Sequence, residues 1–570
     1  MCWIVAVYGL EWGHAHMTDK MVSLLNASRN RGQDGYGVAV YEEGKLSRHV
    51  AHSIREIDET LKTYKSRALA LLWHARYTTS GDGKWGENAL QPFEIKEDEL
   101  TAEAGISFAF NGNIVNAEEL AAELRAEGFT FKHDPILDTE VLKLLMLREV
   151  RKWVTNIATI LEYVHNRIDG CCNIILLDKI GNMAVAKDKW WFRPLVYGVK
   201  DGLLFVASES TALLRIGCEN VNFISGGEIM QVDGATKKIE KTKMNILEPV
   251  EKQRCFFEAV YFADPKTNLW GEAASGYRYR FGQILGEEDN DRFDPADTII
   301  VDIPSSSEDA AKWYADSAGI IRLQAITKHP DATRTFIAEG ESRKLKVKEK
   351  YIFNPNLKQF LKWKKVVLMD DSIVRGTTLT HLVQAFKDFY EPAEVHIRIP
   401  SPPVVAPCFY GINMADIKEL IAANSFRDIK NPTEEELRAL AHNFWATSLR
   451  YLSPSSSSMP CVCTSILSVS LVSQEITQQP VDRELMMRKR HLQQQYKKRS
   501  LQKDKIYYTH SHVGDSPSGK APDSESGTGG SNPSSPTIII SIGLRTTHFV
   551  RVDSETRALV SSPSSPTMNK

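Results

Sequence analysis

The sequence predicts an α+β domain built as a strand-rich sandwich, followed by an α/β domain with an open sheet and then by a long tail. Half-buried strands in the first domain are indicated by apolar runs that alternate with polar residues. Such runs lie at 173–177, 183–186 and 203–207. In the second domain, the apolar residues Val366 to Met369 end at two carboxylates, and a helical periodicity follows from Leu379 to Phe389. This order of strand, polar loop and helix is typical of an open α/β sheet.

Length and composition set the broad class. A chain of 570 residues is too long for one ordinary core, so at least two domains are expected. With 42% hydrophobic and 25% charged residues it is typical of a globular protein, and a formal charge of -2 gives no general attraction to nucleic acid or membranes. A membrane span is not expected, because the sequence has no stretch of roughly 18 apolar residues. A secretory signal is not expected either, because no basic segment precedes the apolar run at the start. Eight cysteines in so long a chain do not form a disulfide framework, so we expect a cytoplasmic protein.

Cys2 is the first candidate for chemistry. Removal of Met1 before so small a side chain would leave a thiol and a free α-amine on one residue. Because an α-amine titrates near pH 8, it can accept the thiol's proton and act as its general base. An isolated cysteine at this position would be incidental, so the segments that follow decide between the two interpretations.

Five further segments of the N-terminal half place polar residues next to apolar runs. They are 31–37, 74–81, 88–93, 108–116 and 138–142. Phe108 to Asn116 is expected to form a strand and a tight turn before a helix from about Ala117, and another helix is expected to begin at Asp138. Together with Cys2, these segments resemble the glutaminase domain of the class II glutamine amidotransferases, which are N-terminal-nucleophile hydrolases.

That resemblance implies an αββα sandwich and a set of roles. Cys2 would attack the side-chain amide of glutamine, and Asn111 with the backbone N–H of Gly112 would hold the oxyanion. Arg76 would pair with the α-carboxylate of the substrate, and Asp138 would receive its α-ammonium. The released ammonia must be kept from water, so a second site should lie close by.

The loop after the apolar run at 366–369 has the composition of an anion site. Ser372, Thr377 and Thr378 can donate hydroxyl hydrogen bonds to phosphate oxygens, and Gly376 lets the backbone come close. Free N–H groups at the start of the next helix would point at the same anion. The two carboxylates before them repel phosphate and suit sugar hydroxyls or a phosphate-bound Mg²⁺. A strand that ends in an Asx turn and caps a helix is the alternative without a ligand.

The whole run from Val366 to Leu379 resembles the phosphoribosyl-pyrophosphate (PRPP) loop of type I phosphoribosyltransferases. Further segments narrow the resemblance to the amidophosphoribosyltransferase family, which opens purine synthesis de novo. They lie at 255–263, 278–282, 298–307, 334–350, 395–412 and 448–453. The implied fold of the second domain is α/β. The implied boundaries are 2–240 for the glutamine amidotransferase domain, 255–453 for the phosphoribosyltransferase domain and 454–570 for a divergent, largely disordered tail.

The same resemblance implies ligands and partners. PRPP would be bound by Asp370, Asp371, Ser372, Arg375, Gly376, Thr377, Thr378, Ser306 and Lys350. Mg²⁺ would be held by Ser306, Asp370 and Asp371. Tyr261 would line the route of ammonia between the two sites. Purine nucleotides would act as inhibitors, and the family's tetramer implies a homo-oligomer.

Three departures from the family qualify the resemblance. Trp3 stands where the family has glycine after the nucleophile, and its ring could crowd the thiol. Ser305 takes the place of an acidic residue in the pyrophosphate loop and removes a negative charge near Mg²⁺. Lys189, Trp190 and Trp191 replace the usual proline and glycine of one turn, which must therefore be rebuilt.

Some members of the family hold a [4Fe–4S] cluster on four cysteines. Cys255 and Cys408 match the first two positions, and Cys461 and Cys463 are the remaining candidates. The latter two stand in a serine-rich segment with one intervening residue instead of two. This spacing favours a protein without the cluster.

The expected reaction converts PRPP, glutamine and water to 5-phosphoribosylamine, glutamate and pyrophosphate. One alternative is a catalytically silent relative that binds PRPP or nucleotides and regulates a partner, which Trp3 and Ser305 would support. The other is a phosphoribosyltransferase that uses only ammonia. The intact PRPP loop and the intact glutaminase residues argue against a silent protein.

Overall fold

The computed structural model describes most of the chain up to residue 453. The described residues are 2–11, 17–27, 31–32, 34–64, 67–77, 86–95, 105–246, 254–289, 292–305, 307–329, 350–405, 408, 410–412, 417–428 and 432–453. All of them belong to one compact unit. The expected tail, 454–570, lies outside the described residues.

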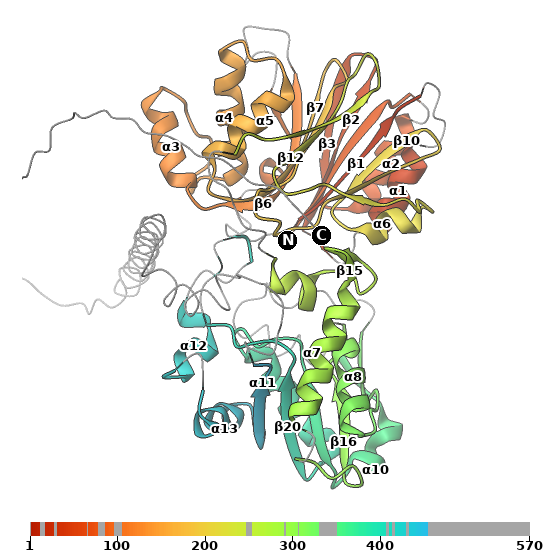
Figure 1. Ribbon diagram of the computed structural model, residues 1–570, viewed down its shortest axis with the longest axis vertical. Helices are drawn as coiled ribbons and strands as arrows, with labels where there is room; N and C mark the ends of the chain where they lie inside the picture. Colours follow the sequence, from red (N-terminus) through yellow and green to blue (C-terminus); the bar gives the residue numbers. More distant parts are fainter. Residues whose placement is uncertain are drawn as a thin grey trace, which may run out of the picture. The chain divides into compact units, whose positions relative to one another are not determined.

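Two antiparallel sheets pack face to face in the first half of the chain (Figure 1). The first contains β1 (Trp3–Gly9), β2 (Gly35–Glu42), β3 (Lys45–Ala51), β4 (Ala70–Arg76), β9 (Val196–Lys200), β10 (Leu203–Ala207) and β11 (Asn222–Phe223). Its order is β11-β9-β10-β1-β4-β2-β3. The second contains β5 (Phe93–Ile95), β6 (Ile106–Ile114), β7 (Gly170–Asp178), β8 (Met183–Ala186), β12 (Glu228–Val232) and β13 (Ile239–Lys243). Its order is β13-β12-β8-β7-β6-β5.

Helices cover the outer face of each sheet. The first sheet packs against α1 (Met17–Ala27), α2 (Ile54–Tyr64) and α6 (Ser210–Arg215), and the second against α3 (Ala117–Ala126), α4 (Asp138–Arg151) and α5 (Ile157–Arg167). Side chains of β1 alternate between the two layers: Ile4 and Ala6 face the other sheet, whereas Val5 and Val7 face the helices. These layers confirm the expected αββα sandwich.

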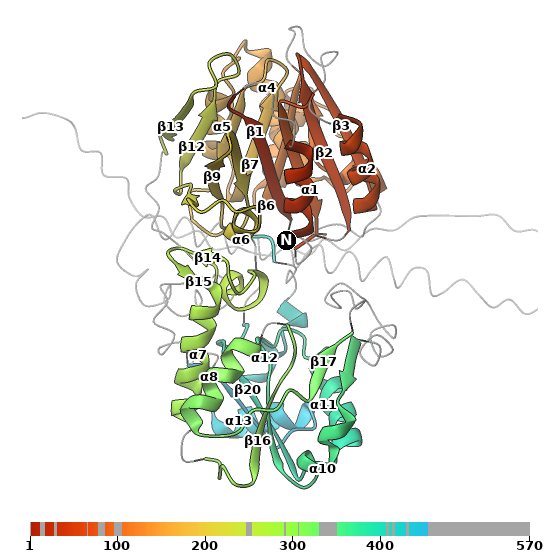
Figure 2. The same ribbon diagram turned by 90° about the vertical axis from the view of Figure 1, so that its right-hand side faces the viewer.

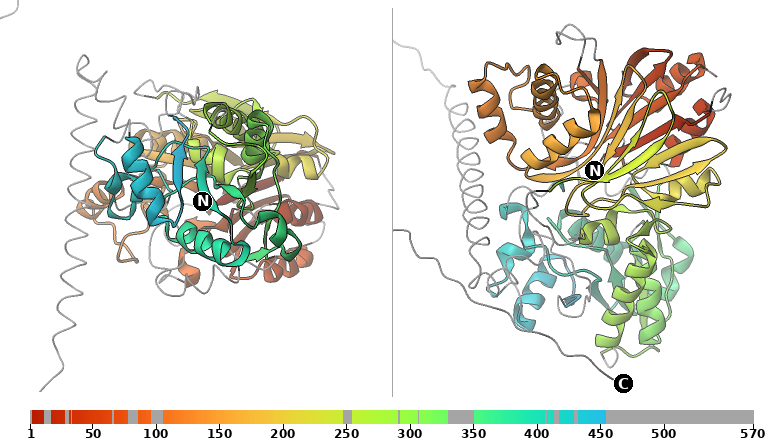
Figure 3. Two further views of the ribbon diagram at one scale, coloured as in Figure 1. Left: turned by 90° about the horizontal axis from the view of Figure 1, so that it is seen from below. Right: turned by 45° about the horizontal axis from the view of Figure 1, so that its top comes forward.

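The second half of the described chain is built around a four-stranded parallel sheet (Figure 2). Its strands, in spatial order, are β16 (Thr298–Asp302), β19 (Lys365–Met369), β20 (Glu394–Ile399) and β21 (Ser448–Tyr451). Ile300 and Val367 point to one face, where α7 (Ala274–Glu288) and α8 (Glu308–Ala318) lie. Val366 and Leu368 point to the other face, with α11 (Thr377–Tyr390) and α13 (Glu434–Asn443). Figure 3 shows helices on both sides of the strands, which confirms an α/β fold.

Short elements complete the described chain. They are the hairpins β14 (Asn268–Leu269) with β15 (Glu272–Ala273) and β17 (Ile326–Lys328) with β18 (Tyr351–Phe353), the helices α10 (Lys358–Leu361) and α12 (Ile421–Ser425), and the turns η1 (Gly86–Ala89), η3 (Glu258–Phe262), η5 (Pro355–Leu357) and η6 (Ile417–Glu419). None of the described helices is both long and apolar enough to cross a membrane.

The strand, turn and helix expected over 108–117 are confirmed. β6 continues through Asn111 and Gly112 to Ile114 and pairs with β7 along its whole length, the turn follows at Val115 and Asn116, and α3 begins at Ala117. A Cβ on Gly112 would lie 1.7 Å from the carbonyl oxygen of Cys171. Glycine is needed here because two backbones come close, and not because the chain turns.

Candidate active sites

Three of the expected glutaminase residues belong to the space between the two sheets. Side chains two residues apart on a strand point to the same face of the sheet. Ile4, His74 and Ala109 face the other sheet, and each is two residues away from one of the expected site residues. Strand alternation therefore directs the side chains of Cys2, Arg76 and Asn111 to the inter-sheet layer. Trp3 pairs with Ala75 across β1 and β4, which brings Cys2 next to the end of β4. The Cys2 thiol lies 3.7 Å from the carbonyl oxygen of Tyr77.

Among the described residues, the Asn111 amide and the Arg76 guanidinium have no partner for their side-chain donors. Asn111 is 1% exposed, and its Nδ2 has no hydrogen-bond partner among the described residues. A buried amide donor without a partner is rare and costs free energy unless a ligand satisfies it. Within the same part of the chain, the guanidinium of Arg76 makes no hydrogen bond or ion pair. These are the donors that an oxyanion and a carboxylate require.

Asp138 is the first residue of α4 and lies at the far end of β6. Its Oδ2 accepts a hydrogen bond of 3.0 Å from the backbone N–H of Ile114. Burial raises the pKa of the Asp138 carboxyl to about 6, and the N–H of Ile114 opposes this shift. A cationic group beside this carboxylate would stabilise its charged form.

The ring of Trp3 does not crowd the thiol. Trp3 is fully buried against α1 on the helix-facing side of β1, together with Val5 and Trp73. Because neighbouring residues of a strand point to opposite faces, its ring and the side chain of Cys2 lie on opposite sides of the sheet.

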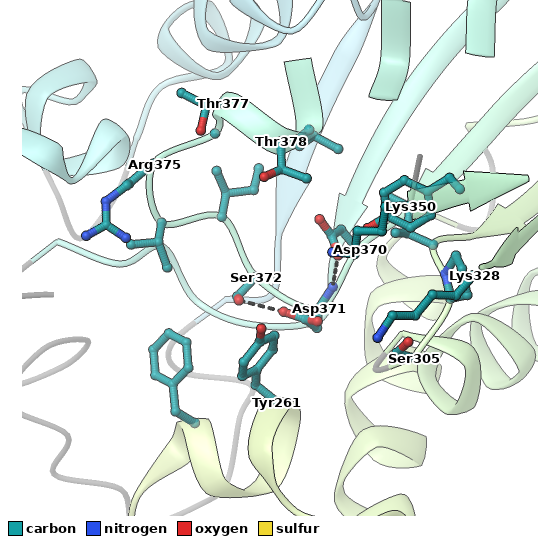
Figure 4. Close-up of a pocket in the computed structure, with 18 of the residues that line it drawn as sticks. Tyr261, Ser305, Lys328, Lys350, Asp370, Asp371, Ser372, Arg375, Thr377 and Thr378 are labelled. Carbon is teal, nitrogen blue, oxygen red and sulfur yellow. Dashed lines mark hydrogen bonds between the residues drawn. The ribbon is translucent and has the colours of Figure 1, made fainter. Parts of the chain in front are cut away.

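The expected PRPP loop lines a cavity of about 160 Å³ at the carboxyl end of β19 (Figure 4). Gly376 precedes α11 and has a φ of 74°, in the left-handed region that favours glycine. A Cβ there would also lie 2.5 Å from the ring of Phe444. Thr377 and Thr378 form the first turn of α11, where no side chain of the described residues caps the helix. The N–H groups of this turn are therefore available to an anion.

Two carboxylates stand at the entrance to this loop. The backbone N–H of Asp371 donates to Oδ1 of Asp370 at 2.9 Å, and the hydroxyl of Ser372 donates to Oδ1 of Asp371 at 2.6 Å. Burial, and secondly the charge of Asp371, raise the pKa of Asp370 to about 8. A divalent cation or the hydroxyls of a sugar would relieve this repulsion, so the donor set fits Mg²⁺.

Positive charge faces these carboxylates from a hairpin. Lys350 and Lys328 both line the cavity, on the same side as Asp370 and Ser305 (Figure 4). Lys328 pairs with Tyr351 across β17 and β18. Sequence reasoning missed Lys328, because the hairpin joins strands separated by more than twenty residues and no local motif marks it. Ser306 lies outside the described residues.

Arg375 lines the cavity but directs its side chain elsewhere. Its guanidinium pairs with Glu419, with Nε 2.8 Å from Oε2, and Figure 4 shows it turned away from Asp370. The binding of PRPP by the Arg375 side chain stays a prediction.

Cys255 and Cys408 are the described cysteines of the expected cluster. Burial, and secondly the neighbouring Cys255, raise the pKa of Cys408 to about 11. Among the described residues, no group of three or more His, Cys, Asp or Glu is arranged for a metal ion. Cys461 and Cys463 lie outside the described residues, so the prediction of a protein without the cluster stays a prediction. Cys171, Cys172 and Cys218 are buried, as expected of core residues.

A buried ion network joins the sandwich to the turn that carries Tyr261. Arg31 donates to Glu258 at 2.6 Å and also pairs with Glu209, and all three side chains are fully buried. Nη1 of Arg193 lies 3.5 Å from the other carboxylate oxygen of Glu258. Glu258 begins η3, whose residues Tyr261 and Phe262 line the cavity. These residues have no role that a local motif reveals, because the partners are separated by 65 to 227 residues along the chain.

Comparisons with known proteins agree with both halves of this description. Residues 86–215 match the family model of a glutamine amidotransferase domain. The amidophosphoribosyltransferase of Methanocaldococcus jannaschii is 33% identical over 456 residues, which cover 77% of this chain and 90% of the relative. The amidophosphoribosyltransferase of Bacillus subtilis is 30% identical, and the match covers 73% of this chain and 83% of the relative.

Two solved structures have a similar fold. The glutamine PRPP amidotransferase of B. subtilis, complexed with ADP and GMP, is 27% identical with a TM-score of 0.66, and the match covers 80% of this chain and 92% of that chain. A structure described as the allosteric regulatory enzyme of purine biosynthesis is also 27% identical, with a TM-score of 0.67 and coverage of 80% and 90%. On the identity and coverage of its relatives, and on its two-part fold, this chain belongs to the amidophosphoribosyltransferase family.

Proposed function

We propose that this protein makes 5-phosphoribosylamine, glutamate and pyrophosphate from PRPP, glutamine and water, with glutamine hydrolysed at one site and PRPP aminated at the other. The observation that carries the proposal is that one chain has two sets of residues. The first set is Cys2, Arg76 and Asn111 in the inter-sheet layer, and the second is the anion loop at residues 370–378. The relatives named amidophosphoribosyltransferase support the same reaction.

In the glutaminase site, Cys2 attacks the side-chain amide of glutamine, and its α-amine accepts the thiol proton. The unpaired Nδ2 of Asn111 donates to the oxyanion, together with the N–H of Gly112. Arg76 binds the α-carboxylate of the substrate and Asp138 its α-ammonium. The tetrahedral intermediate then collapses to a thioester as the C–N bond breaks, and the amide nitrogen leaves as ammonia with the proton that the α-amine had accepted. Water hydrolyses the thioester to glutamate and frees the Cys2 thiol.

In the second site, the N–H groups and hydroxyls of Thr377 and Thr378 hold the 5-phosphate, and Asp370 and Asp371 bind the ribose hydroxyls. Lys328 and Lys350 face the side where the pyrophosphate would leave. Mg²⁺, held at the same carboxylates and at Ser306, would neutralise the departing pyrophosphate. The chain's contribution is position and charge, because the reaction forms no covalent bond to the protein.

The route between the sites would pass η3. Tyr261 and Phe262 line the PRPP cavity, and Glu258 of the same turn binds Arg31 of the sandwich. A passage closed to water would keep ammonia unprotonated until it reaches PRPP.

The proposal is tested by measuring pyrophosphate release from Mg-PRPP with glutamine and, separately, with an ammonium salt. Activity with both supports the two-site enzyme. Activity with ammonium alone would identify an ammonia-dependent phosphoribosyltransferase, and activity with neither would identify a silent relative.

Glutamine should bind less tightly as the pH falls through about 6. Asp138 has a raised pKa, so it is charged above about pH 6 and neutral below, and only the carboxylate attracts an α-ammonium. The dissociation constant should therefore rise roughly tenfold per pH unit below that value. Calorimetry of glutamine binding to the Cys2→Ala variant measures this without turnover. In Asp138→Asn, binding should be weak and independent of pH, and equal pH dependence in both proteins would contradict the role.

Mg-PRPP binding at pH 7 should release protons from the chain. Because Asp370 has a pKa of about 8, it is mostly protonated at this pH, and a bound cation would drive the proton off. Calorimetry in two buffers of different ionisation enthalpy should show up to about one more proton released by the parent than by Asp370→Asn. Equal release by the two proteins would argue against metal binding at Asp370.

The assignments of partners and boundaries extend the same proposal. Purine nucleotides are proposed as inhibitors, which the B. subtilis structure complexed with ADP and GMP supports. A homotetramer, and the domain boundaries at 2–240, 255–453 and 454–570, are proposed from the family resemblance.

A further inference from the structure

Tryptophan occupies backbone positions that this fold shapes for glycine. Among the described residues, ten other than glycine have a left-handed φ, and five of these are tryptophan, although the whole chain has 11 tryptophans in 570 residues. They are Trp153 (φ 65°), Trp191 (φ 67°), Trp270 (φ 56°), Trp363 (φ 62°) and Trp445 (φ 59°). A left-handed backbone is a genuine outlier for so bulky a side chain and is routine only for glycine.

Four helix ends provide a comparison within the chain. At the ends of α3 and α6, Gly128 and Gly217 donate their N–H to the carbonyl three residues earlier, and the next N–H goes to the carbonyl five residues earlier. Trp153 after α4 and Trp445 after α13 make the same two hydrogen bonds. This is the Schellman motif, in which glycine normally takes the left-handed position. Two helices therefore have glycine, and two have tryptophan, in one and the same backbone role.

Turns repeat the pattern. Trp270 and Gly271 form the two-residue loop between β14 and β15, and both have a positive φ. Such loops select glycine and asparagine. Near Trp191, a Cβ built on Gly226 would lie 2.0 Å from two atoms of the indole ring. The ring of Trp191 fits only because residue 226 is also a glycine and has no Cβ.

Side-chain burial gives little compensation at three of the five positions. Trp153, Trp363 and Trp445 are 69%, 72% and 57% exposed, so little apolar surface is buried in return for the backbone strain. The other four described tryptophans are Trp3, Trp73, Trp190 and Trp313. Each has a buried indole N–H with no hydrogen-bond partner in the described part of the chain, whereas buried tryptophans normally find one. All nine described tryptophans thus carry one of two defects.

We propose that the chain synthesised in its own cells carries glycine at the tryptophan positions. The codon UGA is read as tryptophan by some translation systems and as glycine by others, so UGA codons read as glycine would produce this pattern. Trp12 and Trp85, outside the described residues, would be included. Glycine at position 3 and in the 189–191 turn would also remove two of the departures from the family. The inference rests on backbone geometry and does not depend on the proposed reaction.

Peptide mass spectrometry of the protein purified from its native cells tests the proposal directly. Peptides that span 153, 191, 270, 363 and 445 should have the masses of the glycine forms. Tryptophan at any of these five positions would overturn the proposal. So would UGG codons at these positions in the gene, because UGG specifies tryptophan alone.

A second measurement isolates the geometric argument. Trp153→Gly, Trp363→Gly and Trp445→Gly, made singly in the full-length recombinant chain, should each raise the midpoint of urea unfolding. Phe360→Gly is the matched control, because Phe360 is 64% exposed but lies inside α10, where glycine lowers the midpoint. If none of the three tryptophan variants raised the midpoint, the assignment of these positions to glycine would be overturned.

Discussion

Replacing Cys2 with alanine should abolish pyrophosphate release with glutamine and leave the reaction with ammonium intact. Cys2 supplies the only nucleophile of the proposed glutaminase site, so its loss should lower the glutamine rate by roughly a thousandfold or more. The PRPP loop at 370–378 contains no residue of the sandwich, so ammonia from solution should still be used. Pyrophosphate release at saturating Mg-PRPP measures both rates on one preparation.

Cys218→Ala is the control for this experiment. Cys218 is a free thiol, 1% exposed, in the layer between the first sheet and its helices, and its pKa is raised by burial. We expect this variant to keep both reactions. Equal loss of the two reactions in Cys2→Ala would contradict the proposed division between the sites.

Replacing Glu258 with alanine should lower the free energy of unfolding by about 3–5 kcal/mol. Glu258 accepts hydrogen bonds from Arg31 on both carboxylate oxygens and pairs with Arg193 through one of them, and all three side chains are at most 3% exposed. Without it, Arg193 loses its carboxylate partner and Arg31 keeps only Glu209. A buried charge without its partner carries the full desolvation penalty, which is why the effect is large. Urea unfolding followed by circular dichroism measures it.

An exposed ion pair supplies the comparison. Arg55 and Glu59 lie four residues apart on α2, with side chains 86% and 62% exposed. Glu59→Ala should change the free energy of unfolding by about 0.5 kcal/mol or less, because water screens the pair. If Glu258→Ala cost as little as Glu59→Ala, the buried network would have no special role in stability.

Local patterns predicted much of the secondary structure. The apolar runs at 183–186 and 203–207 coincide with β8 and β10, and α3 and α4 begin at Ala117 and Asp138 as expected. These elements are specified by periodicity within ten residues or so, which a single sequence displays. The PRPP loop was also recognisable, because its strand, loop and helix are contiguous.

Features that depend on pairing between distant segments could not be predicted. The close approach that requires glycine at position 112 arises from pairing with β7, some sixty residues later. Lys328 reaches the cavity only through its hairpin with Tyr351. Trp3 was expected to crowd the thiol, and strand alternation places it on the other face. In each case tertiary contacts decide, and a local pattern contains no record of them.

Strand alternation also limits how this chain can vary. Cys2 has no flexible segment between it and β1, so one residue inserted or deleted before Ile4 would turn the thiol toward α1 and away from Asn111. A change in length should therefore be tolerated better in the connections between strands than between Cys2 and Ile4. If Cys2 acts as proposed, an affinity tag should be attached at the carboxyl end, where it leaves the α-amine of Cys2 free.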